Sequence, residues 1–362
     1  MDLAFEDNNY NIVFVNEYEK RFLDAYKYSR KRLHKKILPN GYSETSAEVF
    51  LQDPEMEKLK SMIEKERKEG HIVGFIGGPP CPDFSVAGKN RGENGENGKL
   101  TKTYFDLICL YQPDFFVFEN VKGLVSTERH KKFYDTMKKM LSDNNYYLSD
   151  KLINALSYGV PQYRERIFLI GLNSKNIKNK ESLTINEFSY FEFQWDMFEK
   201  KSIENILKQD WPKNEEFKKY SKRINKYKID EELTVNYWFE KNNVTQHKNN
   251  KDVFKVKNGK QKIETINEGD TSRKSFKRLH RWKYSPTAAY GHNEVHLHPF
   301  MCRRISVAEA MAIQSLPKNF IIKEDIPLTY KFKMIGNGVP YLLGEAIAKT
   351  LYKLLESTEE IK

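Results

Sequence analysis

The chain of 362 residues is long enough for one large and one smaller domain, and 39% of its residues are apolar, 31% charged and 13% aromatic. This composition excludes wholesale disorder, and no apolar stretch approaches the roughly 18 residues that a membrane-spanning helix needs. The formal net charge of +11 favours polyanionic partners.

Targeting and cysteine signals are few. The first residues are acidic and contain no basic-then-apolar run, so we expect no secretory signal. Three cysteines, Cys81, Cys109 and Cys302, cannot build a disulfide framework, and none belongs to a CxxC pair. These features predict a reducing, cytoplasmic compartment and no metal site.

Residues 1–175 alternate between short apolar runs and amphipathic segments. Strands are predicted over residues 11–16, 71–76, 115–119, 147–156 and 166–172, and helices over residues 20–33, 54–68, 100–111 and 131–141. Strands separated by such helices predict an α/β fold, a doubly wound and mostly parallel sheet with helices on both faces. Ligands bind such sheets beyond the carboxyl ends of the strands.

The composition changes near residue 174, where the alternation ends. A hairpin is predicted over residues 253–265, with Asn258-Gly259 as a type I′ turn. Helical periodicity then returns, and the cap-like pair Ser306 and Glu309 opens a predicted helix. The predicted C-terminal helices cover residues 306–315 and 344–355.

The excess positive charge is confined to one segment. Residues 200–283 hold 23 Lys and Arg against 12 Asp and Glu, an excess equal to the net charge of the chain. This segment is either a nucleic-acid surface or a solvated lysine-rich face. The predicted domains are a first domain over 1–175, a smaller, basic, β-containing domain over 176–300, and a return to the first domain over 301–362.

A stiff loop follows the predicted strand at 71–76. It reads Gly77-Gly78-Pro79-Pro80-Cys81, so glycines and prolines hold a cysteine in an exposed position. A packing cysteine would normally lie inside the strand, whereas a nucleophile needs rigid presentation and cationic neighbours that lower its pKa. The pattern favours a nucleophilic Cys81 over a structural one.

Two further segments bring polar side chains to the same edge of the predicted sheet. Glu119 ends a strand, where it is either an ordinary solvated acid or a group that binds or protonates a substrate. Arg164 and Arg166 are two residues apart on an extended segment and therefore point the same way. They form either a surface charge cluster or a fixed guanidinium pair near Cys81 and Glu119.

Taken in order, these segments resemble the DNA (cytosine-5) methyltransferases of bacterial restriction-modification systems. The resemblance rests on the Pro-Cys loop at 79–85, on Glu119-Asn120-Val121, on Gln162-x-Arg164-x-Arg166, and on blocks at 303–317 and 335–340. It covers residues 1–172 and 285–355, and the basic segment falls where the family keeps its variable target-recognition domain. It implies a Rossmann-like methyltransferase fold and methylation of C5 of a cytosine in a specific double-stranded DNA site.

The resemblance also assigns roles to individual residues. Cys81 is implied to form a covalent adduct at C6 of the cytosine, Glu119 to act at N3, Arg166 to clamp the base, and Arg164 to support the loop and thiolate. The base must be flipped out of the duplex to be reached. The implied cofactor is S-adenosyl-L-methionine, bound by Glu17, Pro80, Leu100 and Asn337. For Glu17, a solvated acid at a strand end is the alternative.

The implied partners are double-stranded DNA and, as a genetic partner, a cognate restriction endonuclease, which places the protein at the bacterial nucleoid. The predicted DNA contacts are Ser85, Lys89, Arg91, Arg273, Lys274, Arg278 and Arg281. The last four lie where basic and apolar residues interleave, a pattern that suits phosphate and base contacts or a half-buried helix.

The start of the chain departs from the family pattern. The family opens with a strand and a Phe-x-Gly-x-Gly-Gly turn that cradles the methionine part of the cofactor, whereas Met1–Phe5 resembles the helix after that turn. Three explanations stay open: an internal Met of a longer chain, a second chain that supplies the missing strand, or an inactive relative. The alternative functions are a DNA-binding remnant that cannot hold cofactor and an RNA cytosine methyltransferase.

Overall fold

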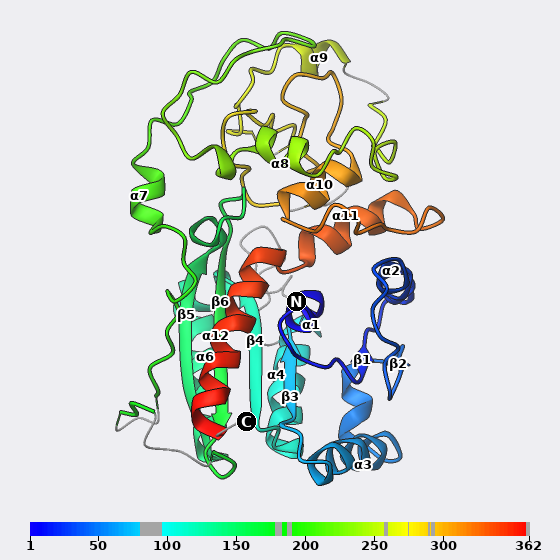
Figure 1. The fold of residues 1–362 in the computed structure, drawn as a ribbon, viewed down its shortest axis with the longest axis vertical. Helices are drawn as coiled ribbons and strands as arrows, with labels where there is room; N and C mark the ends of the chain where they lie inside the picture. Colours follow the sequence, from blue (N-terminus) through cyan, green and yellow to red (C-terminus); the bar gives the residue numbers. More distant parts are fainter. Residues whose placement is uncertain are drawn as a thin grey trace.

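The computed structural model describes residues 1–79, 96–177, 183–186, 190–256, 260–273, 275–288, 290 and 294–359. Figure 1 shows a lower part built on a sheet and an upper part of short helices and irregular segments. The chain passes to the upper part after β6 (Glu165–Asn173) and returns to the lower part with α12 (Tyr341–Glu359). The beginning and the end of the chain therefore share one body.

A four-stranded sheet forms the centre of the lower part. In spatial order its strands are β3 (Gly74–Gly77), β4 (Phe115–Val121), β6 and β5 (Tyr146–Asn154). β3 and β4 are parallel, whereas β6 is antiparallel to both of its neighbours. The α/β class is confirmed, but the sheet is mixed, because β5 and β6 are joined by a short connection that suits antiparallel strands rather than by a crossover.

Helices cover both faces of this sheet, as predicted, because its strands are apolar on both sides. Along β4, Phe115 and Val117 pack in a cluster with α12, whereas Phe116 and Phe118 pack in a second cluster with α4 and α6. α4 spans Glu96–Tyr111 and α6 spans Glu128–Asp143. Each such side chain contributes about 1.5–3 kcal/mol when fully buried, so the two clusters hold the sheet between its helices.

A separate two-stranded sheet pairs β1 (Val15–Asn16) with β2 (Tyr42–Ser43) in parallel. Within the described ranges neither strand pairs with β3, so one edge of β3 carries no neighbouring strand. The strand predicted over 11–16 is therefore only two residues long. A strand needs a partner for its backbone groups, which explains why the apolar run does not extend β1 further.

The other helices of the lower part are α1 (Asp2–Glu6), α2 (Lys20–Arg32), η1 (Ala47–Leu51), α3 (Glu55–Lys68), α5 (Gly123–Ser126) and η3 (Ala155–Tyr158). The helices predicted at α2, α3, α4 and α6 are confirmed. α3 ends just before Gly70, whose φ of +83° favours glycine. No helix in the described part of the chain is long and apolar enough to cross a membrane.

The upper part contains α7 (Ile203–Leu207), η5 (Glu231–Leu233), α8 (Val235–Lys241), α9 (Lys260–Glu264), α10 (Val307–Ile313) and α11 (Leu328–Asn337). Isolated bridges, such as Glu215 with Glu268, connect its extended pieces. The hairpin predicted over 253–265 is wrong, because α9 occupies its second half. Ile263 and Ile266 are the buried residues there, and their three-residue spacing is helical rather than alternating.

The C-terminal segment begins inside the upper part. Ser306 and Glu309 form the predicted capping box at the start of α10, each side chain bonding the other residue's backbone N–H. The core of the upper part also crosses the predicted boundary at residue 300, because Trp238 and Phe239 share a cluster with Met311. Of residues 301–362, only the stretch containing α12 lies against the main sheet.

Candidate active site

β3 leads directly into the loop that carries the predicted nucleophile. Cys81, Pro80, Ser85, Lys89 and Arg91 lie outside the described residues, so their predicted roles rest on the sequence. The approach to the loop is described. A Cβ on Gly78 would lie 3.0 Å from Oε2 of Glu119, and a Cβ on Gly77 would lie 2.4 Å from the ring of Tyr104. Glycine therefore lets the chain pass close against the Glu119 carboxylate.

Glu119 and Arg166 meet across two neighbouring strands. β4 and β6 are antiparallel, and their register pairs Glu119 with Phe168 and Val121 with Arg166. Nε of Arg166 lies 3.0 Å from Oε1 of Glu119, with side chains 12% and 9% exposed. Nη1 of Arg166 donates to the carbonyl of Glu165 at 2.7 Å, which fixes the guanidinium from behind. The structure thus brings together two of the four predicted catalytic residues.

Arg164 has different neighbours. Its side chain is 1% exposed, and Nη1 and Nη2 donate to the carbonyls of Gly336 at 3.0 Å and Gly338 at 3.1 Å. These two carbonyls flank Asn337. Arg164 therefore joins the start of β6 to the turn after α11, whereas Arg166 contacts Glu119, and the two arginines form no common guanidinium pair there.

Glu17 follows β1 and is half-buried. Oε1 accepts the backbone N–H of Glu19 at 2.8 Å, and within the described ranges Oε2 has no protein partner. Burial raises the pKa of Glu17, the N–H of Glu19 opposes this, and among the nearby charges Asp2 raises the pKa while Lys333 lowers it. These two charges show that Glu17 lies near the start of α1 and the face of α11.

The other predicted cofactor residues are less closely defined. Leu100 is part of α4 and partly buried, and Asn337 is exposed at the end of α11. No hydrogen bond or ion pair joins either of them to Glu17 in the described part of the chain. Their common pocket remains a prediction.

The predicted DNA contacts in the 273–281 segment have contrasting surroundings. Arg273 is half-exposed and lies 3.6 Å from Asp270, and Lys274 lies outside the described residues. Arg278 is fully buried and donates to the carbonyls of Ile263, Ile266, His298 and Met301. This placement argues against a DNA contact by Arg278.

Arg281 is also buried, at 3% exposure, and forms a two-point ion pair with Glu268 at 2.7 and 2.9 Å. Its remaining donors bind the carbonyl and hydroxyl of Ser221. This placement argues against a DNA contact by Arg281. The sequence could not reveal either placement, because the acceptors come from segments 12 to 60 residues away.

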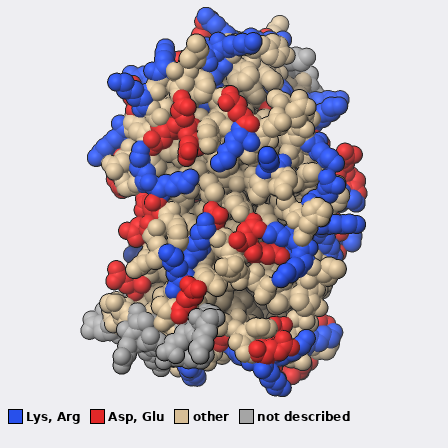
Figure 2. Space-filling model, viewed as in Figure 1, with Lys and Arg blue, Asp and Glu red and all other residues tan. Residues whose placement is uncertain are grey.

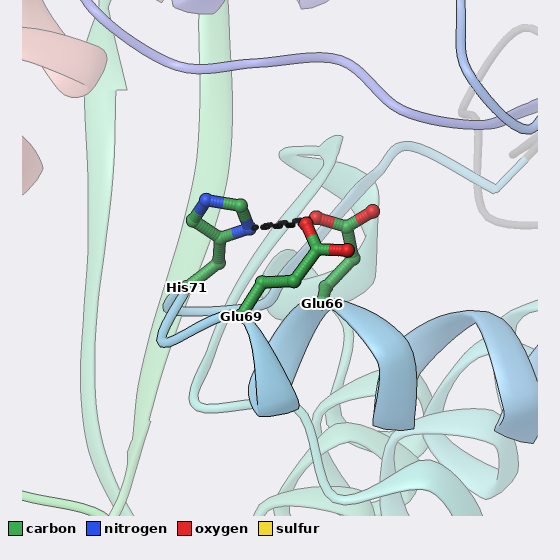
Figure 3. Close-up of side chains that lie close together, drawn as sticks. All are labelled: Glu66, Glu69 and His71. Atoms are coloured by element: carbon green, nitrogen blue, oxygen red, sulfur yellow. Dashed lines mark hydrogen bonds and ion pairs between the residues drawn. The ribbon is translucent and has the colours of Figure 1, made fainter.

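One group of possible metal ligands occurs at the end of α3, where Glu66, Glu69 and His71 lie together (Figure 3). Nδ1 of His71 lies 2.8 Å from Glu66 and 3.9 Å from Glu69, and His71 is half-exposed. The cluster precedes the amino end of β3, whereas Glu119 lies near its carboxyl end. We assign it no metal and no part in the site.

Comparison of the chain with known proteins finds a matching family. A family model described as C-5 cytosine-specific DNA methylase matches residues 1–353. The chain is 50% identical over 361 residues to the type II methyltransferase M.NmeDI of Neisseria meningitidis serogroup C, covering 99% of this chain and 82% of that protein. It is 29% identical to M.FnuDI of Fusobacterium nucleatum, covering 100% of this chain and 94% of the relative.

Solved structures agree on the fold. A prophage-encoded protein of E. coli, described as a DNA modification methyltransferase, matches with a TM-score of 0.61 and 20% identity, covering 98% of this chain and 95% of that one. A mutant of DNMT2 from Spodoptera frugiperda matches with a TM-score of 0.55 and 13% identity, covering 97% and 96%. At these identities the likeness concerns the fold alone.

Proposed function

The chain belongs to the C-5 cytosine-specific DNA methylase family, and from this premise we propose which of its residues carry out methylation of cytosine C5 in DNA. The activity follows from the family, whose description is specific for DNA and does not support the RNA alternative. The observation that carries the residue assignment is the buried Glu119–Arg166 pair beside the glycines that lead to Cys81.

The reaction requires a nucleophile because C5 of cytosine is itself a poor one. Addition of a thiolate to C6 turns the ring into an enamine whose C5 can take up a methyl group. Loss of the C5 proton and elimination of the thiolate then release 5-methylcytosine. We assign the thiolate to Cys81. The target base must leave the duplex to reach it.

Glu119 and Arg166 are assigned to the flipped base. Thiolate addition at C6 is easier when N3 accepts a proton or a hydrogen bond, and a carboxyl group at N3 can supply either. Nε of Arg166 forms an ion pair with Oε1 of Glu119 at 3.0 Å, although this buried oxygen accepts no hydrogen bond from the described residues. Oε2 faces Gly78, where no side chain intervenes. We infer that this oxygen faces the base and that Arg166 fixes the carboxylate and contacts the base edge.

We assign a positioning role to Arg164. Its guanidinium holds the carbonyls on both sides of Asn337, so it sets the distance between the entry to β6 and the turn after α11. The resemblance places a support for the loop and thiolate at this position. The hydrogen bonds to Gly336 and Gly338 support a second positioning function, toward the predicted cofactor side.

We propose S-adenosyl-L-methionine as the methyl donor, which supplies an electrophilic methyl group when bound. Glu17 fits a role on the ribose, because it follows a strand end and Oε2 has no protein partner in the described part of the chain. A carboxylate in this position can accept both ribose hydroxyls. Pro80, Leu100 and Asn337 would complete the pocket, by resemblance.

We further propose that full activity needs a strand from outside residues 1–362, placed between β1 and β3. Phe14 and Phe75 pack against the same cluster on one face, and Ile12 and Ile76 pack against another cluster on the opposite face. The two sheets thus share both apolar layers although no backbone hydrogen bond pairs β1 with β3. All four side chains remain partly exposed, unlike those of β4.

The start of α1 lies against α12, since a Cβ on Gly344 would lie 3.9 Å from Cα of Met1 and 3.1 Å from Cβ of Ala4. A strand from a separate polypeptide is the alternative source.

We propose residues 176–300 as the target-recognition domain and a cognate restriction endonuclease as the genetic partner, as the type II names of the relatives suggest. Action on DNA places the protein at the nucleoid. Expression in a host with the cognate nuclease should make the host DNA resistant to cleavage. If the nuclease cleaved host DNA whose target sites carry 5-methylcytosine, it would not be the cognate partner of this protein.

The assignment of Cys81 is tested by methyl incorporation from labelled S-adenosyl-L-methionine into unmethylated DNA. Cys81→Ala should abolish transfer while DNA binding stays within twofold. Cys109→Ala is the matched control, because burial raises the pKa of Cys109 to about 11 and makes it a poor nucleophile. Transfer by the Cys81 variant would refute the assignment. If the protein is instead a DNA-binding remnant that cannot hold cofactor, the unmodified chain and both variants would bind DNA but transfer no methyl group.

A further inference from the structure

Residues 220–228 of the upper part, which form no strand, present alternate residues to solvent. Tyr220 is 66% exposed and Ile224 92% exposed, and Lys222, Lys226 and Lys228 between and beyond them are exposed as well. We call these five residues the lysine strip. Among the described residues, none of the three lysines forms an ion pair. Ile224 is therefore an almost fully exposed apolar side chain between lysines.

The residues between the members of the strip face inward and are held by buried charges. Ser221 accepts hydrogen bonds from Arg281 at its carbonyl, at 2.6 Å, and at its hydroxyl, at 2.8 Å. Arg223 pairs with Glu215 and lies 3.8 Å from Glu268. The hydroxyl of Tyr227 also donates to Glu215.

Arg281, which binds Ser221, is itself held by an ion pair with Glu268. Glu268 is fully buried and Arg281 nearly so. Burial would raise the pKa of Glu268, but the hydrogen bonds from Arg281 outweigh it and lower the pKa. The carboxylate therefore stays charged, and breaking its ion pair would leave a buried charge without a partner. The segment has no strand ladder, but side chains hold three of its inward residues: Arg281 binds Ser221, and Glu215 binds Arg223 and Tyr227.

Figure 2 shows basic side chains spread over the visible face and interrupted by acidic groups, so overall charge does not single out one contact surface. The lysine strip differs because its exposed members alternate with partly buried residues, so its lysines and Ile224 lie on the exposed side of one segment. Lysines on such a surface can pair with phosphates, and an aliphatic side chain between them can contact a thymine methyl group in a groove.

We propose that the lysine strip contacts duplex DNA, with Lys222, Lys226 and Lys228 on phosphates and Ile224 on base edges. Arg281 and Arg223 then act as positioning residues that hold the strip. The proposal rests on the DNA methylase assignment only for the identity of the polyanion. It moves the predicted DNA contacts of this region from the buried Arg278 and Arg281 to a nearby segment, which Arg281 anchors.

The lysines are tested by binding of a mixed-sequence DNA duplex of 24 base pairs at several salt concentrations. Changing all three to Gln should lower the slope of log affinity against log salt by about 2 to 3, since each phosphate contact contributes about 0.9. The matched control changes Lys31, Lys36 and Lys139, which are exposed and form no ion pair in the described part of the chain. Equal slopes for both triple variants would overturn the proposal.

Ile224 is tested against Ile37, which is 91% exposed and lies outside the strip. The target site is first identified by sequencing 5-methylcytosine in DNA from cells that express the protein. Ile224→Ser should lower the preference for that site over mixed-sequence DNA about tenfold without changing the salt slope, while Ile37→Ser should not change it. An unchanged preference in Ile224→Ser would exclude base contact by this residue.

These readouts separate the two proposals. If no DNA becomes methylated but the lysine variants still lose salt slope, the strip is a DNA surface and the catalytic assignment is wrong. If methylation occurs and the lysine variants bind as the unmodified chain does, the catalytic assignment stands and the strip contacts something else. Thermal unfolding of each variant checks that the fold is kept.

Discussion

At the scale of single residues, the candidate site combines one close pair with several separate contacts. Glu119 and Arg166 could be predicted together, because both lie at strand ends and neighbouring strands bring such ends to one edge. Arg164 could not be paired from the sequence, since its acceptors at Gly336 and Gly338 lie more than 170 residues away. The sequence predicted DNA contacts by Arg278 and Arg281 because it shows that these residues are basic. It does not show the buried acceptors that they bind, which lie elsewhere in the chain.

The Glu119–Arg166 pair gives a prediction for catalysis. Glu119→Gln should lower the turnover number about 100-fold or more, because the amide cannot protonate N3. Arg166→Lys should lower it by about tenfold or more, because an ammonium group cannot hold carboxylate and base together. Single-turnover methyl transfer measures both.

The control is Arg67→Lys, which alters an arginine–carboxylate pair with Asp114, 3.3 Å apart at the other end of the same sheet. This variant should keep its turnover within about twofold if the site is confined to the carboxyl end of β3. Equal losses in Arg67→Lys and Arg166→Lys would instead mean that both arginines act through the fold alone.

Two buried histidines predict the response to acid. Burial lowers the pKa of His280 to about 4 and that of His296 to about 3, from an ordinary value of 6.5. The unfolded chain therefore binds more protons below pH 6.5, so these groups stabilise the fold fully above that pH and less as the pH falls toward 4. Each can lower the free energy of unfolding by up to about 1.4 kcal/mol per pH unit.

Chemical denaturation at pH 7 and pH 5 measures this effect. His280→Gln should reduce the difference between the two pH values, whereas His34→Gln, which alters an exposed histidine, should leave it unchanged. A pH dependence that is the same in all three proteins would show that His280 is not responsible.

At the scale of elements, the sequence signals for helix ends were reliable. The capping pair Ser306 and Glu309 predicted the start of α10, and Gly70 predicted the end of α3. The turn predicted at Asn258-Gly259 lies outside the described residues, but the hairpin predicted around it is wrong because α9 occupies its second half. A turn signal needs two strands that alternate between buried and exposed residues, and the buried isoleucines at 263 and 266 have helical spacing instead.

The cap of α10 predicts two sizes of destabilisation. Ser306→Ala should cost about 1 kcal/mol of the free energy of unfolding, the usual value for a lost cap. Glu309→Gln should cost about 3 kcal/mol, because Glu309 also pairs with Arg303 at 2.7 Å and with buried His298 at 3.4 Å. Denaturant titrations at pH 7 give both values, and equal losses would mean that Arg303 and His298 contribute nothing beyond the cap.

At the scale of the whole molecule, the sequence predicted two domains, and the packing divides the chain differently. Trp238 and Phe239 of the basic segment share a core with Met311 and Phe332. A deletion of residues 200–283 would therefore remove part of the core of residues 301–337 together with any DNA surface. Surface substitutions separate recognition from folding, which such a deletion cannot do.

The unpaired edge of β3 predicts the effect of an added strand. A chain extended by its upstream in-frame codons should show amide exchange at Ile76 slowed about tenfold or more, because its N–H faces the unpaired edge of β3 and gains a partner. Methyl transfer should rise in parallel. The control is the same extension with proline at alternate positions, because proline lacks the backbone N–H that pairing with β3 requires.

Unchanged exchange in the extended chain would contradict the proposed strand, whether or not methyl transfer occurs. Slow exchange already present in the unextended chain, together with a dimeric mass, would show that a second copy covers the edge instead.

The hydrogen bonds of Arg164 have a consequence for the life of the protein in the cell. They join residue 164 to carbonyls near the C-terminus, and α1 packs on α12, so the first and last parts of the chain complete one body. On a translating ribosome, Arg164 emerges 172 residues before its acceptor at Gly336. We therefore expect a nascent chain to acquire methyl transfer only after α11 and the turn that follows it have been synthesised.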